Sequence, residues 1–296
     1  MRYVPVLPLA LLIGVAQPAA ALQAGRAQTA EQRAEQERQL QDELRAPRPI
    51  DAVNSVWIDE LTWLEVRDAL AGGKKTAIVA TGGIEQNGPY LVTGKHNVVL
   101  RGACESIARK LGDALCAPVI GFVPEGAIEP KSGHMRYPGT ISLREETFRM
   151  LLEDVASSLR AHGFTGIVFI GDSGGNQRGM EAVAAALNER WTDASVYFIP
   201  EFYRYEEVER YMEEDLGFAQ PVDEGLHDNL YITSLMMAVD PVSVRYEERV
   251  RAGKASINGA SIAPRERTID LGRKLLEFRT DMTVRAINAA RAAGGR

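Results

Sequence analysis

The sequence predicts an α/β fold in which a mostly parallel sheet is covered by helices on both faces. Two observations carry this prediction. Short β-rich runs alternate with longer helical segments, as in parallel strands joined by helical crossovers. The composition, 45% hydrophobic and 25% charged over 296 residues, is that of a globular chain long enough to bury a large core.

Glycines bound several of the predicted elements. A helix at residues 63–70 ends at Gly72-Gly73, and a helix at 145–161 is closed by Gly163, because glycine readily ends helices. Further helices are predicted at 97–111, 180–190, 229–239 and 269–293, and strands at 76–80, 117–123, 166–170 and 195–199. Ligands of such sheets bind beyond the carboxyl ends of the strands, so the loops after residues 80, 123 and 170 are candidate site regions.

The N-terminal residues predict export. Met1-Arg2 is a short positive start, residues 4–15 are almost wholly apolar, and small residues precede a signal peptidase site after Ala21. The alternative is an uncleaved membrane anchor, but the apolar run is short for a span of about 20 residues. We therefore expect residues 1–21 to be a signal peptide. The mature protein is then periplasmic or secreted, with no stable membrane span after cleavage.

The rest of the chain is predicted to contain a charged lead-in and one domain. Residues 22–52 contain few large apolar residues, which indicates a solvated helix or a disordered segment. Residues 53–296 are predicted to form a single α/β domain. The net charge of -6, without a basic cluster interleaved with aromatic residues, gives no reason to expect a nucleic-acid partner.

The chain contains two cysteines, Cys104 and Cys116. An oxidising compartment would permit a disulfide between them. However, Cys104 lies in a predicted helix and Cys116 opens the β-rich region at 117–123, and both are small apolar residues in buried stretches. We expect two buried free thiols, because cysteine is among the residue types most often buried.

The strongest site candidate is the loop Gly171-Asp172-Ser173-Gly174-Gly175-Asn176, which follows a predicted strand and precedes a helix. Its glycines allow a tight turn and close approach to a ligand, and free backbone N–H groups at a helix start favour an oxyanion. Gly-x-Ser-x-Gly in this setting also fits a nucleophile elbow with Ser173 as nucleophile. The alternative is a structural turn in which Ser173 caps the helix.

Three other polar stretches hold candidate residues. After the strand at 76–80, Glu85 and His96 could ligate a metal or act as base and acid, although a rigid solvated turn would look the same. His134 beside Arg136 could bind a substrate carboxylate or carbonyl, or could lie in an ordinary surface loop. His227-Asp228 precedes a predicted helix, where capping by Asp228 is the alternative to a functional pair.

Together these stretches resemble the creatininase (creatinine amidohydrolase) family. Residues 84–91 are similar to the family's Glu-x-His-Gly-x-His-Leu segment, and residues 134–143 to its His-x-x-Phe-Pro-Gly-Thr-Ile-Ser-Leu segment. Residues 171–176 fall where the family has Asn-Gly-His-Gly-Gly-Asn, and residues 227–236 resemble its His-Ala-Gly-x-x-x-Thr-Ser segment. The order and approximate spacing match over residues 58 to about 240.

The resemblance implies an α/β/α layered fold and a metal-dependent amidohydrolase, often oligomeric, with a two-metal centre of zinc or manganese. In such enzymes a metal-bound hydroxide attacks a cyclic or linear amide carbonyl. For this chain it implies a small-molecule substrate, a divalent metal and a homo-oligomer.

The chain departs from the family pattern at several ligand positions. Asn87 and Ser173 stand where ligand histidines belong, His96 stands where a bridging aspartate is expected, and Gly175 offers no side chain. Ile232 lies where a carboxylate is often found. Asparagine and serine are poor zinc ligands beside histidine and carboxylate.

Three hypotheses follow from these departures. In the first, Glu85, His96, Asp172 and His227 form a remodelled metal site. In the second, Ser173 is a metal-independent nucleophile, with His96 or His227 as base and Asp228 or Glu85 as orienting group. In the third, the protein is a non-catalytic binder of a small polar ligand.

We favour the remodelled metal site, and thus an exported creatininase-like amidohydrolase that hydrolyses a carbon–nitrogen amide bond of a small, cyclic or linear substrate. The candidate catalytic residues are Ser173, His227 and Asp228. The candidate substrate-binding residues come from three of the four stretches and are Asn87, Tyr90, Lys95, His134, Arg136, Gly174, Gly175 and Asn176.

Overall fold

The computed structural model describes residues 29–294 and divides the chain after Pro49. The predicted signal peptide, residues 1–21, lies outside the described residues. In the first unit, helix α1 (Ala30–Arg45) begins at Thr29, which forms a capping box with Gln32, and none of its residues is buried. Within the described part of the lead-in, residues 30–45 thus form a solvated helix.

The second unit, residues 50–296, contains a four-stranded parallel sheet in the order β2-β1-β3-β4. The strands are β1 (Thr76–Thr81), β2 (Ala114–Cys116), β3 (Gly166–Gly171) and β4 (Ser195–Phe198). Thr81 pairs with Gly171, so β1 and β3 end side by side. This arrangement confirms the predicted α/β class with a parallel sheet.

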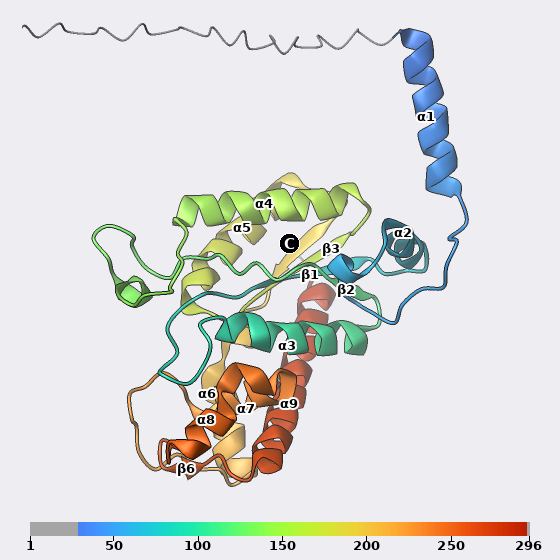
Figure 1. Cartoon of the computed structure of the whole chain (residues 1–296). Helices are drawn as coiled ribbons and strands as arrows, with labels where there is room; N and C mark the ends of the chain where they lie inside the picture. Colours follow the sequence, from blue (N-terminus) through green and yellow to red (C-terminus); the bar gives the residue numbers. More distant parts are fainter. Residues whose placement is uncertain (1–28, 295–296) are drawn as a thin grey trace, which may run out of the picture. The chain divides into compact units, whose positions relative to one another are not determined.

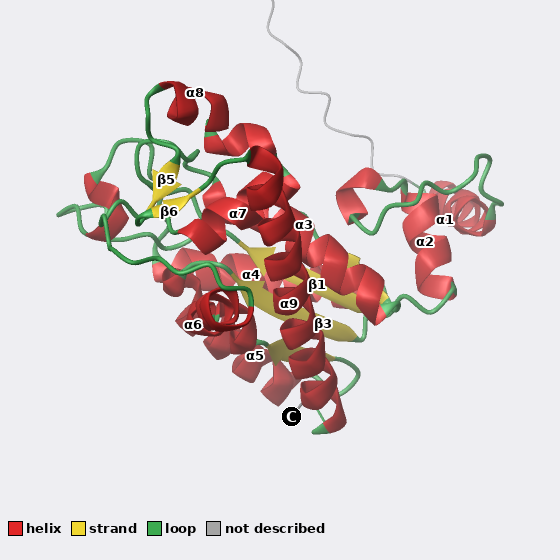
Figure 2. Cartoon of the chain, turned by 90° about the horizontal axis from the view of Figure 1, so that it is seen from below, coloured by secondary structure: helices red, strands yellow, loops and turns green. Residues whose placement is uncertain are grey.

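Helices cover both faces of the sheet (Figures 1 and 2). Helices α4 (Glu145–Ala161) and α5 (Gln177–Arg190) lie on one face, and α3 (Lys95–Leu111) and α9 (Arg265–Ala292) lie on the other. The strands between them are almost wholly buried, as expected when both faces are covered.

A second hydrophobic cluster forms around α7 (Leu230–Val239), which packs along α9. The two helices approach so closely that a Cβ on Gly272 would lie 1.8 Å from the Ser234 carbonyl oxygen, so glycine is required there. The remaining helices are α2 (Trp63–Ala71), α6 (Tyr205–Arg210) and α8 (Tyr246–Arg251), and a small hairpin joins β5 (Ser256–Ile257) to β6 (Ala260–Ser261).

The predicted strand at 117–123 is wrong. The regular strand β2 ends at Cys116, and the following residues contact neighbouring chain segments through single bridges such as Ile120 to Thr81. Pro118 has no N–H to donate and Gly121 weakens a strand, so an apolar run alone does not make a ladder here.

The expectation of free thiols is also wrong, because Cys104 and Cys116 form a disulfide. Helix α3 packs on β2 and brings the two Cα atoms to 6.3 Å, within the range that a disulfide spans. Both residues are buried, as expected, but their pairing depends on this helix-to-strand contact.

Within residues 29–294, no helix is both long enough and apolar enough to cross a bilayer.

A candidate active site at the carboxyl ends of the strands

A polar cavity of about 230 Å³ lies beyond the carboxyl ends of β1 and β3. This is the edge of a parallel sheet where ligands normally bind. The turn after β3, several loops and the first turns of α3 and α7 contribute to it. Its lining residues are Glu85, Lys95, His96, His134, Ser173, Gly174, Tyr203, Tyr205, His227, Asn229, Tyr231 and Ile232.

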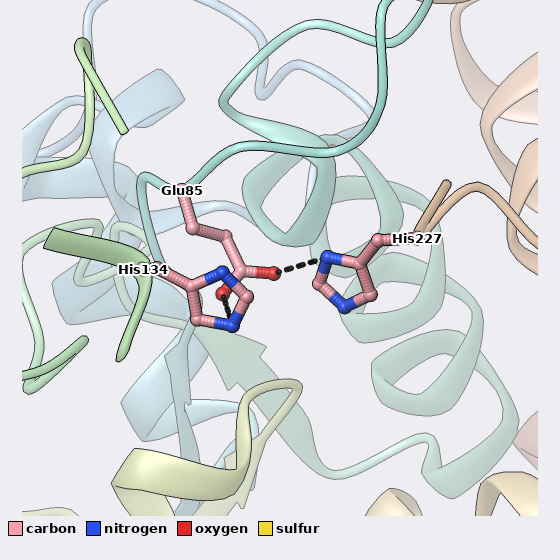
Figure 3. Close-up of side chains that lie close together, drawn as sticks. All are labelled: Glu85, His134 and His227. Carbon is pink, nitrogen blue, oxygen red and sulfur yellow. Dashed lines mark ion pairs between the residues drawn. The ribbon is translucent and has the colours of Figure 1, made fainter. Parts of the chain in front are cut away.

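Three side chains from separate loops converge in this cavity, namely Glu85, His134 and His227 (Figure 3). Nε2 of His134 lies 3.0 Å from Oε2 of Glu85, and Nδ1 of His227 lies 3.7 Å from Oε1. The two imidazole rings stack with centroids 5.0 Å apart. One ligand atom from each residue lies within 4.8 Å of the other two.

Local hydrogen bonds fix the loops that carry these residues. The buried Asn87 amide donates to the carbonyl oxygens of Glu85 and Val92, which closes the loop after β1. The backbone N–H of His134 donates to the Glu125 carbonyl. Nδ1 of His227 lies 3.1 Å from the carbonyl oxygen of Gln86, which ties the loop before α7 to the Glu85 loop.

Beneath this group, His96 bridges two buried carboxylates. Its Nε2 lies 2.9 Å from Oε1 of Glu85, and its Nδ1 lies 2.8 Å from Oδ2 of Asp172. Asp172 also accepts a 2.5 Å hydrogen bond from Arg279, while the Lys95 ammonium lies 3.4 Å from Glu85. The cavity floor is therefore a chain of alternating charges.

This charge alternation decides how the groups titrate. Burial opposes ionisation of Glu85, but hydrogen bonding and charge from His96 and the charge of Lys95 lower its pKa well below the usual range. Burial would lower the pKa of His96, but the bonds to Asp172 and Glu85 raise it. Burial would raise the pKa of Asp172, and the charge of Arg279 lowers it instead. His96 is thus held as a cation between two anions.

Glu125, from the loop that precedes His134, behaves in the opposite way. Burial and the nearby charge of Glu85 raise its pKa to about 8. The Ser173 hydroxyl donates to its Oε2 at 3.3 Å, and its buried Oε1 has no hydrogen-bond partner among the described residues. Glu125 therefore carries a proton at neutral pH.

The converging residues fit one divalent metal ion. A carboxylate and two imidazoles, with a fourth position open to a cavity, form the donor set of catalytic zinc sites. Burial and the charge of Lys95 lower the pKa of His227, which favours the neutral imidazole that a metal requires. Within the described part of the chain, no second group of three such side chains converges in this way.

The structure separates the four residues predicted as metal ligands. Glu85 and His227 join the converging group, together with His134, which was predicted to bind substrate. His96 and Asp172 do not join it, because both His96 nitrogens are bonded to carboxylates and both Asp172 oxygens accept from His96 or Arg279.

Ser173 and Asp228 do not form a catalytic triad with a histidine among the described residues. The Ser173 hydroxyl lines the cavity but donates to Glu125, and no histidine within residues 29–294 is hydrogen-bonded to it. Asp228 is buried and pairs with Arg249 at 3.0 Å instead of orienting His227. The Tyr90 ring packs against the same guanidinium, outside the cavity.

Of the other predicted substrate-binding residues, some line the cavity and some stabilise the loops around it. Lys95 and Gly174 line the cavity, whereas Arg136 is exposed outside it. The Asn176 amide donates to Thr81 and Gly82 and fastens the turn to the end of β1. Gly175 packs against Pro124, with room for no side chain.

Several residues in or next to the cavity were not predicted from the sequence. The phenol rings of Tyr203, Tyr205 and Tyr231 form one wall, and the Tyr205 hydroxyl donates to the carbonyl oxygen of Asp172. Arg279 reaches the site from α9, where it lies on the buried face one turn after Leu275. A charged residue on an apolar helix face is the one signal that could have identified it.

Comparison with known proteins agrees with this arrangement. The family model described as creatininase, creatinine amidohydrolase, matches residues 59–287. The chain belongs to the creatininase family. The resemblance of its four sequence segments to that family is thereby confirmed.

Individual relatives are distant in sequence but similar in fold. A creatinine amidohydrolase of Pseudomonas putida is 24% identical over 195 residues, which cover 63% of this chain and 73% of that protein. A crystal structure of creatinine amidohydrolase superposes with a TM-score of 0.58 at 22% identity, covering 80% of this chain and 98% of that one. A manganese form superposes with the same TM-score, covering 81% and 99%.

The family consists of hydrolases that act on carbon–nitrogen bonds other than peptide bonds. Its solved structures include manganese and zinc–zinc forms. In this chain, Glu85, His134 and His227 form a group that could hold a divalent ion.

Proposed function

We propose that the protein is an amidohydrolase of small cyclic or linear amides that uses one divalent metal ion, zinc or manganese, held by Glu85, His134 and His227. The observation that carries this proposal is the convergence of these three donors in a cavity of about 230 Å³ within a creatininase fold. The departures from the family pattern thus remodel the metal site without abolishing it.

A divalent ion in this position would supply Lewis acidity toward an amide carbonyl and would acidify a water molecule. The protein residues supply the rest. Glu85 stays ionised because His96 and Lys95 surround it with positive charge. Glu125 holds a proton on a carboxyl group beside the Ser173 hydroxyl. If that hydroxyl turns its own hydrogen toward a departing amine and accepts the Glu125 proton in exchange, the pair can act as the general acid.

The cavity also limits the substrate. Its volume of about 230 Å³ suits a small molecule, and three tyrosine rings form a wall that a flat amide could pack against. The Lys95 ammonium offers a buried positive charge next to the converging group. These features favour a compact polar amide over a long chain.

We also propose that the mature protein functions outside the cytoplasm as a homo-oligomer. The signal-peptide pattern at residues 1–21 supports export, and a buried disulfide is typical of proteins from oxidising compartments. Assembly is proposed from the resemblance to the family.

Metal analysis of the purified mature protein tests the proposal. We expect stoichiometric zinc or manganese in wild type, at least a tenfold loss of affinity in His134→Ala, and no loss in His162→Ala. His162 is the matched control because it is an exposed histidine at the end of α4. Turnover of small amides, creatinine included, should follow metal content.

Two results would contradict the proposal. Labelling by a fluorophosphonate that is lost in Ser173→Ala, without bound metal, would indicate a serine hydrolase. Ligand binding across the amide panel without metal, labelling or turnover would indicate a non-catalytic binder.

A further inference from the structure

The loop that carries His227 is held in an unusual backbone conformation. His227 has φ of 61°, in the left-handed region that side chains other than glycine rarely adopt. Its side chain is half-exposed, stacks on His134 and reaches the Gln86 carbonyl oxygen, so few contacts of its own hold this geometry. Neighbouring contacts must therefore stabilise the conformation that turns its Nδ1 toward Glu85.

One such contact comes from the loop after β1. Gly88, with φ of 67°, lies so close to the His227 loop that a Cβ would be 2.6 Å from the Leu226 carbonyl oxygen. The same Cβ would lie 3.5 Å from Asp228. The two loops are thus in close contact next to the Glu85–His227 pair.

The second contact is a buried ion pair directly after His227. Asp228 and Arg249 are each about 1% exposed, and Nη1 of Arg249 donates to Oδ2 of Asp228 at 3.0 Å. The guanidinium also donates to the carbonyl oxygens of Lys254 and Ser256, each at about 3 Å, so its position is fixed by α8 and the following turn. The Tyr90 ring packs on its face at 4.4 Å.

We propose that Tyr90, Asp228 and Arg249 form a clamp that positions His227 for metal binding. The proposal rests on the proposed metal site. The clamp joins the Glu85 loop, through Tyr90, to the residue that follows His227, through Asp228. Because Arg249 is anchored to backbone carbonyls, it holds Asp228 and thus the strained His227 backbone at a fixed distance from Glu85.

This role differs from helix capping by Asp228. The Asp228 carboxylate is bonded to Arg249, and the N-cap position of α7 is occupied by Asn229. A buried ion pair costs desolvation free energy and is often replaceable by apolar residues with no loss of stability. Its placement beside a strained ligand therefore points to orientation of that ligand.

The test measures zinc affinity of the full mature protein, stripped of metal by a chelator, by competition with a chromophoric chelator. Arg249→Met is the principal variant. In the double variant Asp228→Asn/Arg249→Met no unpaired charge is left buried, which keeps the test usable if the single variant unfolds. Arg101→Met is the matched control, because Arg101 also pairs with a carboxylate and packs on an aromatic ring, but in α3 away from His227.

We expect at least a tenfold loss of zinc affinity in both clamp variants at a temperature where circular dichroism shows them folded, because loss of groups that orient a metal ligand commonly costs about 10–100-fold. Arg101→Met should remain within about twofold of wild type by the same reasoning. A cobalt absorption spectrum with weakened imidazole coordination in the clamp variants would support the same conclusion.

Wild-type zinc affinity in the folded clamp variants would overturn the clamp while leaving the metal site intact. Absence of zinc and manganese binding in wild type would overturn both proposals. The two failures are therefore distinguishable in one set of titrations.

Discussion

Glu85 and Glu125 are neighbouring buried carboxyl groups whose surroundings shift their pKa values in opposite directions. Glu85 is surrounded by His96, Lys95 and His134, which keep it ionised. Glu125 is buried without a cation of its own and is raised to about 8 by burial and by the charge of Glu85. Paired groups separated in this way commonly serve as acid and base in one site.

Glu125→Gln should change how stability depends on pH. Folded Glu125 keeps its proton up to about pH 8, whereas the unfolded group loses it near the ordinary glutamate value. The folded state therefore binds more protons in this window, and wild-type stability falls as pH rises through it, by at most about 1.4 kcal/mol per pH unit from this group. Chemical denaturation of chelator-treated protein at pH 5, 7 and 9 measures the effect.

Glutamine does not titrate, so the Glu125→Gln protein should lack the loss of stability that Glu125 causes as pH rises. Its stability relative to wild type should therefore increase between pH 5 and 9. Parallel pH profiles for the two proteins would show that Glu125 has an ordinary pKa.

Elements bring the site together through close backbone contacts. The turn after β3 passes between Tyr203 and Pro124, and glycine is required at position 175, where a Cβ would collide with the Pro124 backbone. Helix α3 begins at Lys95, so its first residues place Lys95 and His96 next to Glu85. Helix α9 carries Arg279 to the other side of Asp172. Movement of any of these elements would separate oppositely charged side chains that are buried as pairs, and an unpaired buried charge is costly.

Gly175→Ala should destabilise the fold. An added Cβ would lie 2.0 Å from the Pro124 carbonyl oxygen, so the turn would have to move, at a cost of about 1–3 kcal/mol. Gly94→Ala is the control, because its Cβ would meet nothing closer than Asn97 at 3.9 Å. Urea denaturation of both variants measures the difference, and equal stability would show that the turn adapts freely.

Loss of the Cys104–Cys116 disulfide should lower stability by about 2–4 kcal/mol, because the bond restricts the unfolded chain. Thermal unfolding with and without reductant measures the effect in wild type. The double variant Cys104→Ala/Cys116→Ala should show no response to reductant. Two titratable thiols in the unfolded, unreduced protein would contradict the pairing.

At the scale of the whole molecule, the described chain contains one solvated helix and one unit with two hydrophobic clusters. The clusters, one around the sheet and one around α7, are joined by α9, which contributes Ile287 to the first and Leu271 and Leu275 to the second. In contrast, α1 buries no residue. No described residue before Ile50 belongs to either cluster.

A chain that begins at Ile50 should still unfold cooperatively, because no described residue before Ile50 belongs to either hydrophobic cluster. Removal of residues 275–294 is the comparison, because it deletes Leu275 and Ile287 from the clusters, together with the buried Met282, and should abolish cooperative unfolding. Denaturation curves of the three proteins measure this. A large loss on removing residues before Ile50 would show that α1 supports the fold.

Local sequence was enough to predict most helices, three of the four sheet strands, the parallel sheet and the family. Apolar periodicity and helix-ending glycines are patterns among residues that are close in the chain, so they can be recognised in the sequence alone. The strand at 117–123 was misplaced because apolar content alone does not reveal that the ladder ends at Cys116.

Contacts between distant segments were decided by the tertiary structure. The sequence predicted Glu85 and His227 as metal ligands and His134 as a substrate-binding residue, but the convergence of these three arises because their loops meet at one edge of the sheet. The same holds for Cys104 with Cys116, Asp172 with Arg279, and Asp228 with Arg249. These pairings depend on how helices pack on the sheet, and no local pattern in a single sequence specifies which distant partner a buried charge or thiol will meet.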